Sequence, residues 1–185
     1  MRKIFMFNLM TVDGYFEGPG REIDWHNVDA EFNEYAIKML DSADFLIFGR
    51  VTYELMAGYW PTEEALQDDP IVAEKMNSKS KIVLSKTLDK ADWNNTTLIK
   101  ENINEEIKKI KNQPGRDMAI LGSASIISGF VQHGLIDEFR IMVNPLILGK
   151  GNPLFRGFMG RLNLKLTESR TFKSGNVLLC YELLK

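Results

Sequence analysis

The architecture of the chain is indicated most directly by the segment Phe45-Leu46-Ile47-Phe48-Gly49-Arg50-Val51-Thr52. Its first four residues are an uninterrupted apolar run, which is typical of a parallel strand buried on both faces of a sheet. Gly49 ends the run, and the sequence after it predicts a short helix over residues 50–57. A buried strand that passes through a glycine into a helix is the repeating unit of an α/β protein.

A second segment of this kind is Met118-Ala119-Ile120-Leu121-Gly122-Ser123. Here too an apolar strand ends at a glycine, and Ser123 is a residue type that caps helices. A helix with its apolar face over residues 126–131 should follow and end near Gly134, a residue type common after helix C-termini.

Before these two units, residues 3–9 predict a strand that leads into a loop. That loop, residues 11–21, contains three glycines and one proline. Asp29 is a plausible N-cap for a helix that begins at Ala30, because the apolar residues after it follow a helical spacing.

Between the two units, Asp69-Pro70 predicts a helix start, because aspartate is a good N-cap and proline is favoured in the first helical turn. Residues 81–85 and 97–99 predict two further strands. Residues 103–110 place isoleucine on one side of a charged surface helix.

The C-terminal part of the chain is rich in predicted strands, at residues 139–148, 162–172 and 177–184. Ser174-Gly175-Asn176 is typical of a hairpin turn between the last two. Alternating strands and helices followed by this tail predict an α/β fold. Its central sheet should be mostly parallel, with antiparallel strands at the C-terminal edge and helices on both faces.

Composition limits the possible functions. The chain has 185 residues, of which 44% are hydrophobic and 26% charged, with a formal net charge of −2. These values predict one globular domain over residues 1–185 and no nucleic-acid partner, since phosphate backbones require clustered Lys and Arg. With Cys180 as its single cysteine and with two histidines, the chain predicts no disulfide and no metal site. No segment is long enough to span a membrane, so we expect a cytoplasmic protein.

The two strand–glycine–helix junctions are the first candidate site. A helix N-terminus presents unpaired N–H groups and partial positive charge, which suit phosphate. Glycine at a tight turn is also an ordinary need of any α/β protein, so one junction alone indicates little. Two junctions, with Arg50 able to make a forked contact to phosphate, favour a nucleotide site. Neither matches the Rossmann or P-loop glycine pattern.

Asp13 and Asp29 are the carboxylates that we assign to the catalytic, substrate-facing side. A reductase whose cofactor carries the electron chemistry needs few catalytic side chains, which suits this sequence. The alternatives are a turn at Asp13 and the N-cap at Asp29. Tyr15 and Trp25 are candidates to contact a flat ligand. His26 either faces that ligand or lies on a surface loop.

The sequence resembles the dihydrofolate reductase-like superfamily and, within it, the RibD C-terminal domain family. The resemblance covers essentially the whole chain. The segments that carry it are Thr11-Val12-Asp13-Gly14-Tyr15, Phe48-Gly49-Arg50-Val51-Thr52-Tyr53-Glu54, Val83-Leu84-Ser85-Lys86, Ile120-Leu121-Gly122-Ser123 and residues 137–149. Two departures are Tyr15, where riboflavin reductase domains usually have lysine or arginine, and Ser123, where the family usually has a second glycine.

The resemblance implies a dihydrofolate reductase-like fold and an NADPH site made of three segments. The turn that meets the phosphates is matched by Gly49, Arg50, Val51 and Thr52. The strand end near the adenosine 2′-phosphate is matched by Ser85 and Lys86. The helix start that holds the pyrophosphate is matched by Leu121, Gly122, Ser123, Ala124, Ser125 and Ile126.

The predicted function is therefore transfer of hydride from NADPH to a small heterocycle of pterin or pyrimidine type. One alternative is reduction of 5-amino-6-(5-phosphoribosylamino)uracil in riboflavin biosynthesis. An alternative of another class is a non-catalytic sensor that binds NADPH or another nucleotide. Apolar strands near the C-terminus also predict a homodimer, and the resemblance implies the same, because relatives in this family commonly pair through their β-rich C-terminal regions.

Overall fold

A parallel sheet with an antiparallel edge forms the centre of the molecule. The computed structural model describes residues 1–184. Its main strands are β1 (Ile4–Thr11), β3 (Ala43–Gly49), β4 (Ser80–Leu84), β5 (Thr96–Ile99), β6 (Asp117–Leu121), β7 (Glu138–Asn144), β9 (Leu164–Thr171) and β10 (Val177–Leu183). They lie in the order β5-β4-β3-β6-β1-β7-β10-β9. The strands from β5 to β7 are parallel, and β10 and β9 are antiparallel. The predicted α/β class is confirmed.

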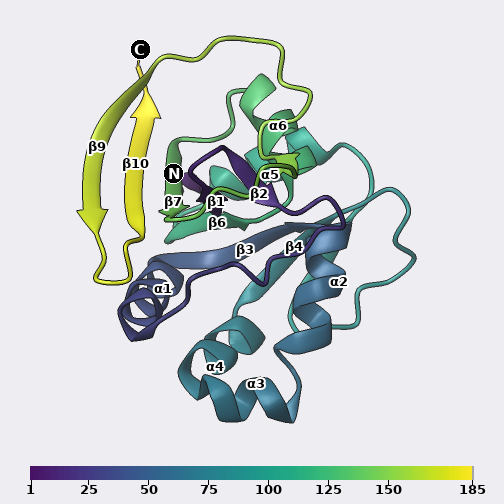
Figure 1. Cartoon of the computed structure of the whole chain (residues 1–185). Coiled ribbons are helices and arrows are strands. Elements are labelled where there is room, and N and C mark those ends of the chain that lie inside the picture. Colours follow the sequence, from purple (N-terminus) through teal and green to yellow (C-terminus); the bar gives the residue numbers. More distant parts are fainter. Residues whose placement is uncertain (185) are drawn as a thin grey trace.

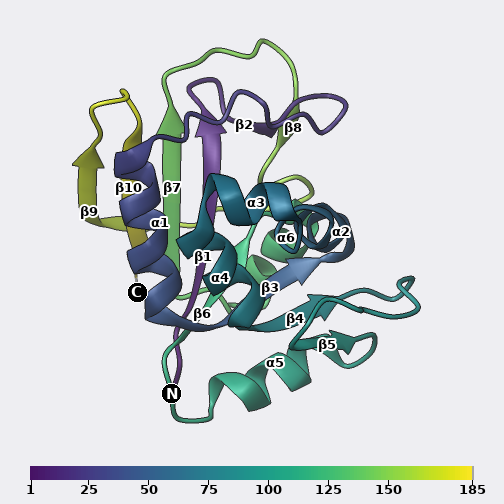
Figure 2. The same ribbon diagram turned by 90° about the horizontal axis from the view of Figure 1, so that it is seen from below.

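Helices cover both faces of this sheet (Figures 1 and 2). The helices are α1 (Ala30–Ser42), α2 (Arg50–Tyr59), α3 (Glu63–Asp68), α4 (Pro70–Ser78), α5 (Ile103–Lys111) and α6 (Ala124–Gln132). Residues of α1, α2 and α4 share one core cluster, and residues of α5 and α6 share a second. Strands β2 (Tyr15–Glu17) and β8 (Asn152–Pro153) form a small separate pair.

The two core clusters follow from the alternation of side chains along each strand. In β1, Phe5 and Phe7 belong to the α1 side, whereas Ile4 and Met6 belong to the α6 side. All four are buried, as expected for a central strand covered on both faces.

The predicted helix starts are confirmed. Asp29 accepts a 2.8 Å hydrogen bond from the N–H of Phe32, and Asp69 accepts one of 3.3 Å from the N–H of Val72. The strand predicted at residues 139–148 is shorter in the structure and ends at Asn144. Pro145 follows, and it has no N–H with which to continue the ladder.

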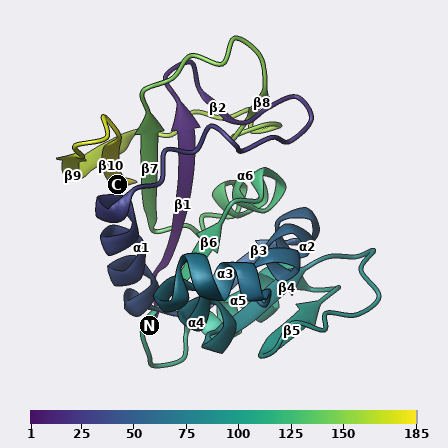
Figure 3. The ribbon, with the colours of Figure 1, turned by 60° about the horizontal axis from the view of Figure 1, so that its bottom comes forward.

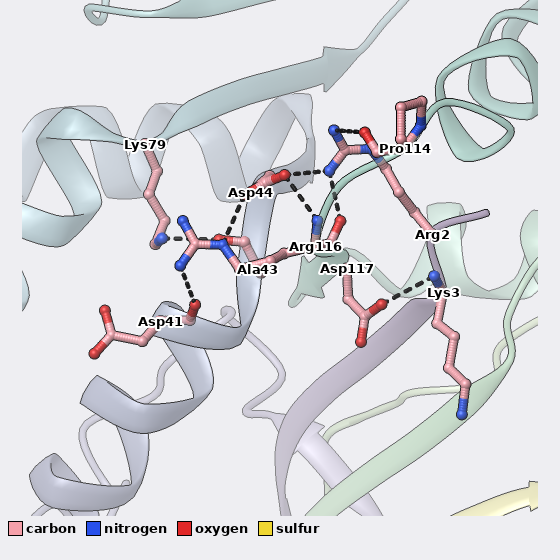
Figure 4. A network of polar contacts seen from close by, with 9 residues as sticks. All are labelled: Arg2, Lys3, Asp41, Ala43, Asp44, Lys79, Pro114, Arg116 and Asp117. Carbon is pink, nitrogen blue, oxygen red and sulfur yellow. Dashed lines mark hydrogen bonds and ion pairs between the residues drawn. The ribbon is translucent and has the colours of Figure 1, made fainter.

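The amino-terminal ends of β1, β3 and β6 are joined by a cluster of ion pairs and hydrogen bonds (Figure 4). The buried guanidinium of Arg2 donates to the carboxylate of Asp44 and, over 2.9 Å, to the carbonyl of Pro114. Nε of Arg116 donates to the same carboxylate over 2.9 Å. The hydrogen bond from Arg2, the largest cause, and those from Arg116 lower the pKa of Asp44 to about 2, against an opposing effect of burial. This cluster ties three strands of the sheet together at one end.

A lysine of β4, Lys81, is buried against the end of α4. Nζ of Lys81 donates to the carbonyls of Met76, Asn77 and Lys79 at 2.9, 3.0 and 2.8 Å, and lies 4.4 Å from the ring centre of Trp93. Burial lowers the pKa of Lys81 to about 8. The lysine therefore satisfies carbonyls that the helix end leaves without an intrahelical donor.

The C-terminal edge of the sheet exposes apolar side chains. Every residue of β9 except Arg170 is exposed, including Leu164 and Leu166.

Of the helices in residues 1–184, none combines the length and the apolar character that crossing a membrane requires.

Candidate active site

The two glycine junctions that the sequence singles out meet in the structure. Strands β3 and β6 are neighbours in the sheet, so both junctions lie at the same edge. The N–H of Gly49 donates a 2.7 Å hydrogen bond to Oγ of Ser123. That hydroxyl in turn donates to Oγ1 of Thr52 over 2.8 Å. One serine therefore connects the start of α2 to the start of α6.

The helices that leave these two strands go to opposite faces of the sheet. α2 contributes Tyr53 to the core on the α1 side, and α6 contributes Ile127 and Phe130 to the other core. A crevice opens where adjacent parallel strands send their connections to opposite faces, and ligands of open α/β sheets bind there. α2 and α6 lie near each other at this end of the sheet in Figure 3, and Figure 1 shows them on opposite faces of it.

The start of α6 has an uncommon backbone. Gly122 and Ser123 both have positive φ, at 69° and 61°. A Cβ at Gly122 would lie 3.0 Å from Cγ2 of Thr52, so only glycine leaves this contact unstrained. Ser123 precedes the helix but makes no side-chain cap to it, because its hydroxyl is engaged with Gly49 and Thr52. The Ser123 side chain therefore does not cap the first amides of α6, although its carbonyl accepts from the N–H of Ile126 over 3.0 Å.

A cleft of about 810 Å³ begins at this junction and extends along the α1 side of the sheet. Its volume is in the range of small-molecule and cofactor sites. Most of its surface is apolar, with contributions from α1, α2 and α4. The residues that line it are Phe7, Asn8, Leu9, Phe16, Glu17, Arg21, Ile23, His26, Val28, Phe32, Asn33, Ala36, Met39, Leu40, Val51, Thr52, Leu55, Met56, Tyr59, Trp60, Asp68, Asp69, Val72, Met76, Leu121 and Gly122.

A second, shallower groove of about 560 Å³ lies beside α2 and is lined by Arg50, Glu54, Thr87, Leu88, Asp89 and Lys90. Arg50 is exposed and pairs with Glu54 over 3.0 Å. Oγ of Ser85 accepts hydrogen bonds from the N–H groups of Thr87 and Leu88 at 3.2 and 3.0 Å. Ser85 thereby shapes the turn that supplies this groove, while Lys86 projects into solvent.

Comparison with known proteins is consistent with this arrangement. The model of the family described as "RibD C-terminal domain" matches residues 2–178. The chain belongs to the RibD C-terminal domain family.

Proteins that are similar to this chain align with nearly the whole of it. The Bacillus subtilis protein YyaP, whose description is "Uncharacterized protein", is 37% identical over 182 residues, which are 97% of this chain and 94% of YyaP. A putative riboflavin biosynthesis protein from Shewanella sp. PV-4 has a TM-score of 0.76 at 23% identity, covering 99% of each chain. Dihydrofolate reductase from Enterococcus faecalis, complexed with NADP(H), has a TM-score of 0.66 at 14% identity, covering 99% of this chain and 97% of that one. The fold is therefore dihydrofolate reductase-like, as predicted.

The carboxylates assigned to catalysis from sequence lie outside the cleft of this RibD C-terminal domain. Asp13 accepts hydrogen bonds from the N–H groups of Leu148 and Gly149 at 3.1 and 2.8 Å. A hydrogen bond from the Thr11 side chain, with these backbone donors, lowers the pKa of Asp13. Asp29 caps α1. Both carboxylates thus have roles within the fold, and their catalytic assignment stays an untested prediction.

The two aromatic candidates also lie beside the cleft rather than along it. Tyr15 belongs to β2 and pairs with Pro153. Nε1 of Trp25 donates to the carbonyl of Glu22 over 3.2 Å, and its ring packs edge-on against His26 with 4.6 Å between ring centres. These contacts support the loop that covers the cleft.

His26 is the member of this loop that does line the cleft. Its neighbour Asn27 fixes the loop, because its N–H donates to Oδ1 of Asn144 and its amide donates to the carbonyl of Ser174. Burial lowers the pKa of His26 to about 4, against a smaller opposing effect of Asp24. The imidazole is therefore neutral at neutral pH.

Asn8 is a cleft residue that the sequence reasoning did not assign. It is buried in β1, one position beyond the last pair between β1 and β6. At this point β6 ends and leaves that side of β1 open to the cleft. The available signal was a polar residue that interrupts the apolar run of the first strand.

Proposed function

We propose that this protein is an NADPH-dependent reductase of a small heterocyclic compound. The observation that carries the proposal is the Gly49–Ser123–Thr52 contact, because it places two phosphate-compatible helix starts beside an apolar cleft. Family membership supports a reductase of the RibD type.

The residues at the two junctions fit the cofactor. The first turn of α6 offers the backbone N–H groups of Ala124 and Ser125 to a pyrophosphate, whereas the N–H of Ile126 donates to the carbonyl of Ser123 over 3.0 Å. Gly122 leaves space against Thr52 that a Cβ would fill. In the shallower groove, Arg50 and Lys90 provide the positive charge that an adenosine 2′-phosphate requires. NADPH, when bound by these residues, would supply the hydride for the reduction.

The remaining residues of the cleft bind and orient the heterocycle and exclude water. Phe32, Met39 and Leu40 form an apolar wall on the α1 side. His26 is neutral near pH 7 because its pKa is about 4, so it does not deliver a proton from an imidazolium.

The decisive experiment measures cofactor binding and turnover separately. Calorimetric titration with NADPH should give a defined affinity. NADPH oxidation should then be measured with a panel of pterins and pyrimidines that includes 5-amino-6-(5-phosphoribosylamino)uracil. We expect oxidation with at least one of these compounds. Binding without oxidation in the whole panel would favour a sensor, and a protein that binds no NADPH would refute the proposal.

A further inference from the structure

The cleft extends far from the junction at which it begins. Thr52 and Gly122 line it at the junction, where β3 and β6 end. On α1 the lining residues run from Phe32 to Leu40, which corresponds to about 12 Å of helix. Because α1 leads to the amino-terminal end of β3, Leu40 lies at the end of the cleft away from the junction. We call this part of the cleft, between α1 and α4, its remote end.

The remote end has apolar walls. Met39 and Leu40 of α1 and Val72 and Met76 of α4 line it, and all four are buried members of one core cluster. Figures 1 and 2 both show α4 between α1 and α2. From α2, Met56 adds a third methionine to the lining of the cleft. Methionine side chains are unbranched and polarisable, so they adapt to apolar groups of different shapes.

One side of α2 continues the apolar lining to the surface. Val51, Leu55 and Tyr59 follow one another at intervals of one helical turn, so they lie on the same side of the helix. All three line the cleft, yet they are 38%, 51% and 38% exposed. Large apolar side chains that gather at a cleft and stay open to solvent are typical of a ligand site.

The charges around the cleft disfavour an anionic ligand. Among the described residues that line it, Arg21 is the only arginine or lysine, and it is exposed on the loop before α1. Glu17, Asp68 and Asp69 contribute three carboxylates. Oε1 of Glu17 accepts from Nδ2 of Asn152 over 2.8 Å, which keeps this charge in place. A phosphate or carboxylate on the ligand would therefore lose hydration in an apolar space without gaining a buried cation.

We propose that the substrate is an uncharged aromatic compound with an apolar substituent, and that the remote end of the cleft binds this substituent. The aromatic ring lies near the junction, and the substituent extends along α1 between Met39 and Met76. Removal of its surface from water provides the affinity. The proposal rests on the proposed function for the position of the cofactor. It excludes substrates that carry a phosphate or a carboxylate, 5-amino-6-(5-phosphoribosylamino)uracil among them.

The experiment titrates the full chain with three quinoxalines, once without cofactor and once saturated with NADP⁺, which carries no hydride to transfer. Quinoxaline is the bare ring, 2-phenylquinoxaline adds an apolar substituent, and 4-(quinoxalin-2-yl)benzoate adds a negative charge to that substituent. The wild-type protein should bind 2-phenylquinoxaline at least tenfold more tightly than either of the other two compounds.

A first variant fills the space along α1. Ala36 lines the cleft between Phe32 and Leu40, so Ala36→Met should weaken the binding of 2-phenylquinoxaline at least tenfold and that of quinoxaline less than threefold. Ala73→Met is the matched control, because Ala73 of α4 is fully buried and is not among the residues that line the cleft. In urea unfolding Ala73→Met should lose more stability than Ala36→Met, since the longer side chain has no open space to enter.

A second variant changes an exposed residue and should leave the fold intact. Leu55→Gln should weaken the binding of 2-phenylquinoxaline at least threefold, because it makes the α2 side of the cleft polar. Leu66→Gln is its control, since Leu66 is a similarly exposed leucine of α3 that is not among the residues lining the cleft. That control should bind all three compounds as the wild type does.

Three results overturn the proposal. They are equal affinities of the wild type for quinoxaline and 2-phenylquinoxaline, a benzoate that binds as tightly as 2-phenylquinoxaline, and folded Ala36→Met and Leu55→Gln proteins that both bind 2-phenylquinoxaline as the wild type does. A wild-type protein that binds neither NADPH nor NADP⁺ would instead refute the proposed function. The preference among the quinoxalines is still measured without cofactor in that case, so the two failures are distinguishable.

Discussion

The backbone N–H of Gly49 donates to Oγ of Ser123, a residue 74 positions later in the chain. Ser123→Ala removes the acceptor and should lower the free energy of unfolding by about 1–3 kcal/mol, because a buried N–H is left unpaired. Ser123→Gly loses the same bond but relieves a left-handed backbone, which costs a non-glycine residue about 1–2 kcal/mol. Urea unfolding should therefore show a smaller loss for glycine than for alanine. Equal losses would show that the backbone at this residue is not strained.

Gly122 should tolerate no side chain. In Gly122→Ala the positive φ is strained and the new Cβ meets Thr52, so we expect a loss of at least about 1 kcal/mol of stability and weaker NADPH binding. Gly58→Ala is the matched control, since its Cβ meets no atom within 4 Å inside α2. That change should stabilise the protein by about 0.5–1 kcal/mol and leave the cofactor affinity intact. Unaltered NADPH binding in a folded Gly122→Ala protein would remove this junction from the site.

Arg50 should discriminate NADPH from NADH. Arg50→Ala is expected to weaken the binding of NADPH about tenfold or more, since a charge-assisted hydrogen bond to the 2′-phosphate contributes about 1.5–3 kcal/mol to binding. NADH lacks that phosphate and should be little affected. Glu54→Gln provides the control, because it releases Arg50 from its ion pair and should not weaken NADPH. A similar loss for both cofactors in titrations of Arg50→Ala would contradict the assignment.

We predict that the homodimer forms through the exposed leucines of β9. Leu166 is 49% exposed and lies opposite Tyr181 of β10, which continues an apolar surface across the edge of the sheet. Sedimentation over a dilution series should show a dimer that persists at micromolar concentration. Leu166→Glu should produce monomers, whereas Lys165→Glu, on the opposite face of the same strand, should not. A wild-type protein that sediments only as a monomer would exclude the dimer.

Lys81 should make stability depend on pH in the alkaline range. Its pKa is about 8 in the folded protein and 10.5 ordinarily, so between these values the unfolded chain holds a proton that the folded chain has released. The free energy of unfolding should therefore rise as the pH increases from 8 towards 10.5. Lys81→Met lacks this titration. The free energy of unfolding of the wild type minus that of the variant should therefore increase over the same pH range. A difference that is independent of pH would place the pKa of Lys81 near its ordinary value.

Local features of this chain could be predicted from sequence because they depend on neighbouring residues. The caps at Asp29 and Asp69 and the strand ends at Gly49 and Leu121 are of this kind. The end of β7 at Asn144 was placed too late, because its apolar sequence continues past Pro145, which has no N–H with which to extend the ladder.

The site was less predictable because it depends on the order of the strands. Each glycine junction was recognisable alone, but their contact through Ser123 requires β3 and β6 to be adjacent. Asn8 is among the residues that line the cleft only because β6 ends beside it. Asp13, in contrast, is of a residue type common in active sites. Its carboxylate instead accepts hydrogen bonds from the backbone N–H groups of Leu148 and Gly149, which lie far away in the sequence.

The cluster of Arg2, Asp44 and Arg116 lies at the amino-terminal ends of the strands, and the cleft lies at their carboxyl-terminal ends. The side chains that clamp the sheet are therefore not those that contact a ligand. A substitution at Asn8 or His26 leaves the clamp intact, and it also replaces a polar atom that has no partner in the fold. Such a protein can exchange one substrate for another during evolution without first acquiring extra stability. Diversification among its descendants should accordingly concentrate at the cleft end of the sheet.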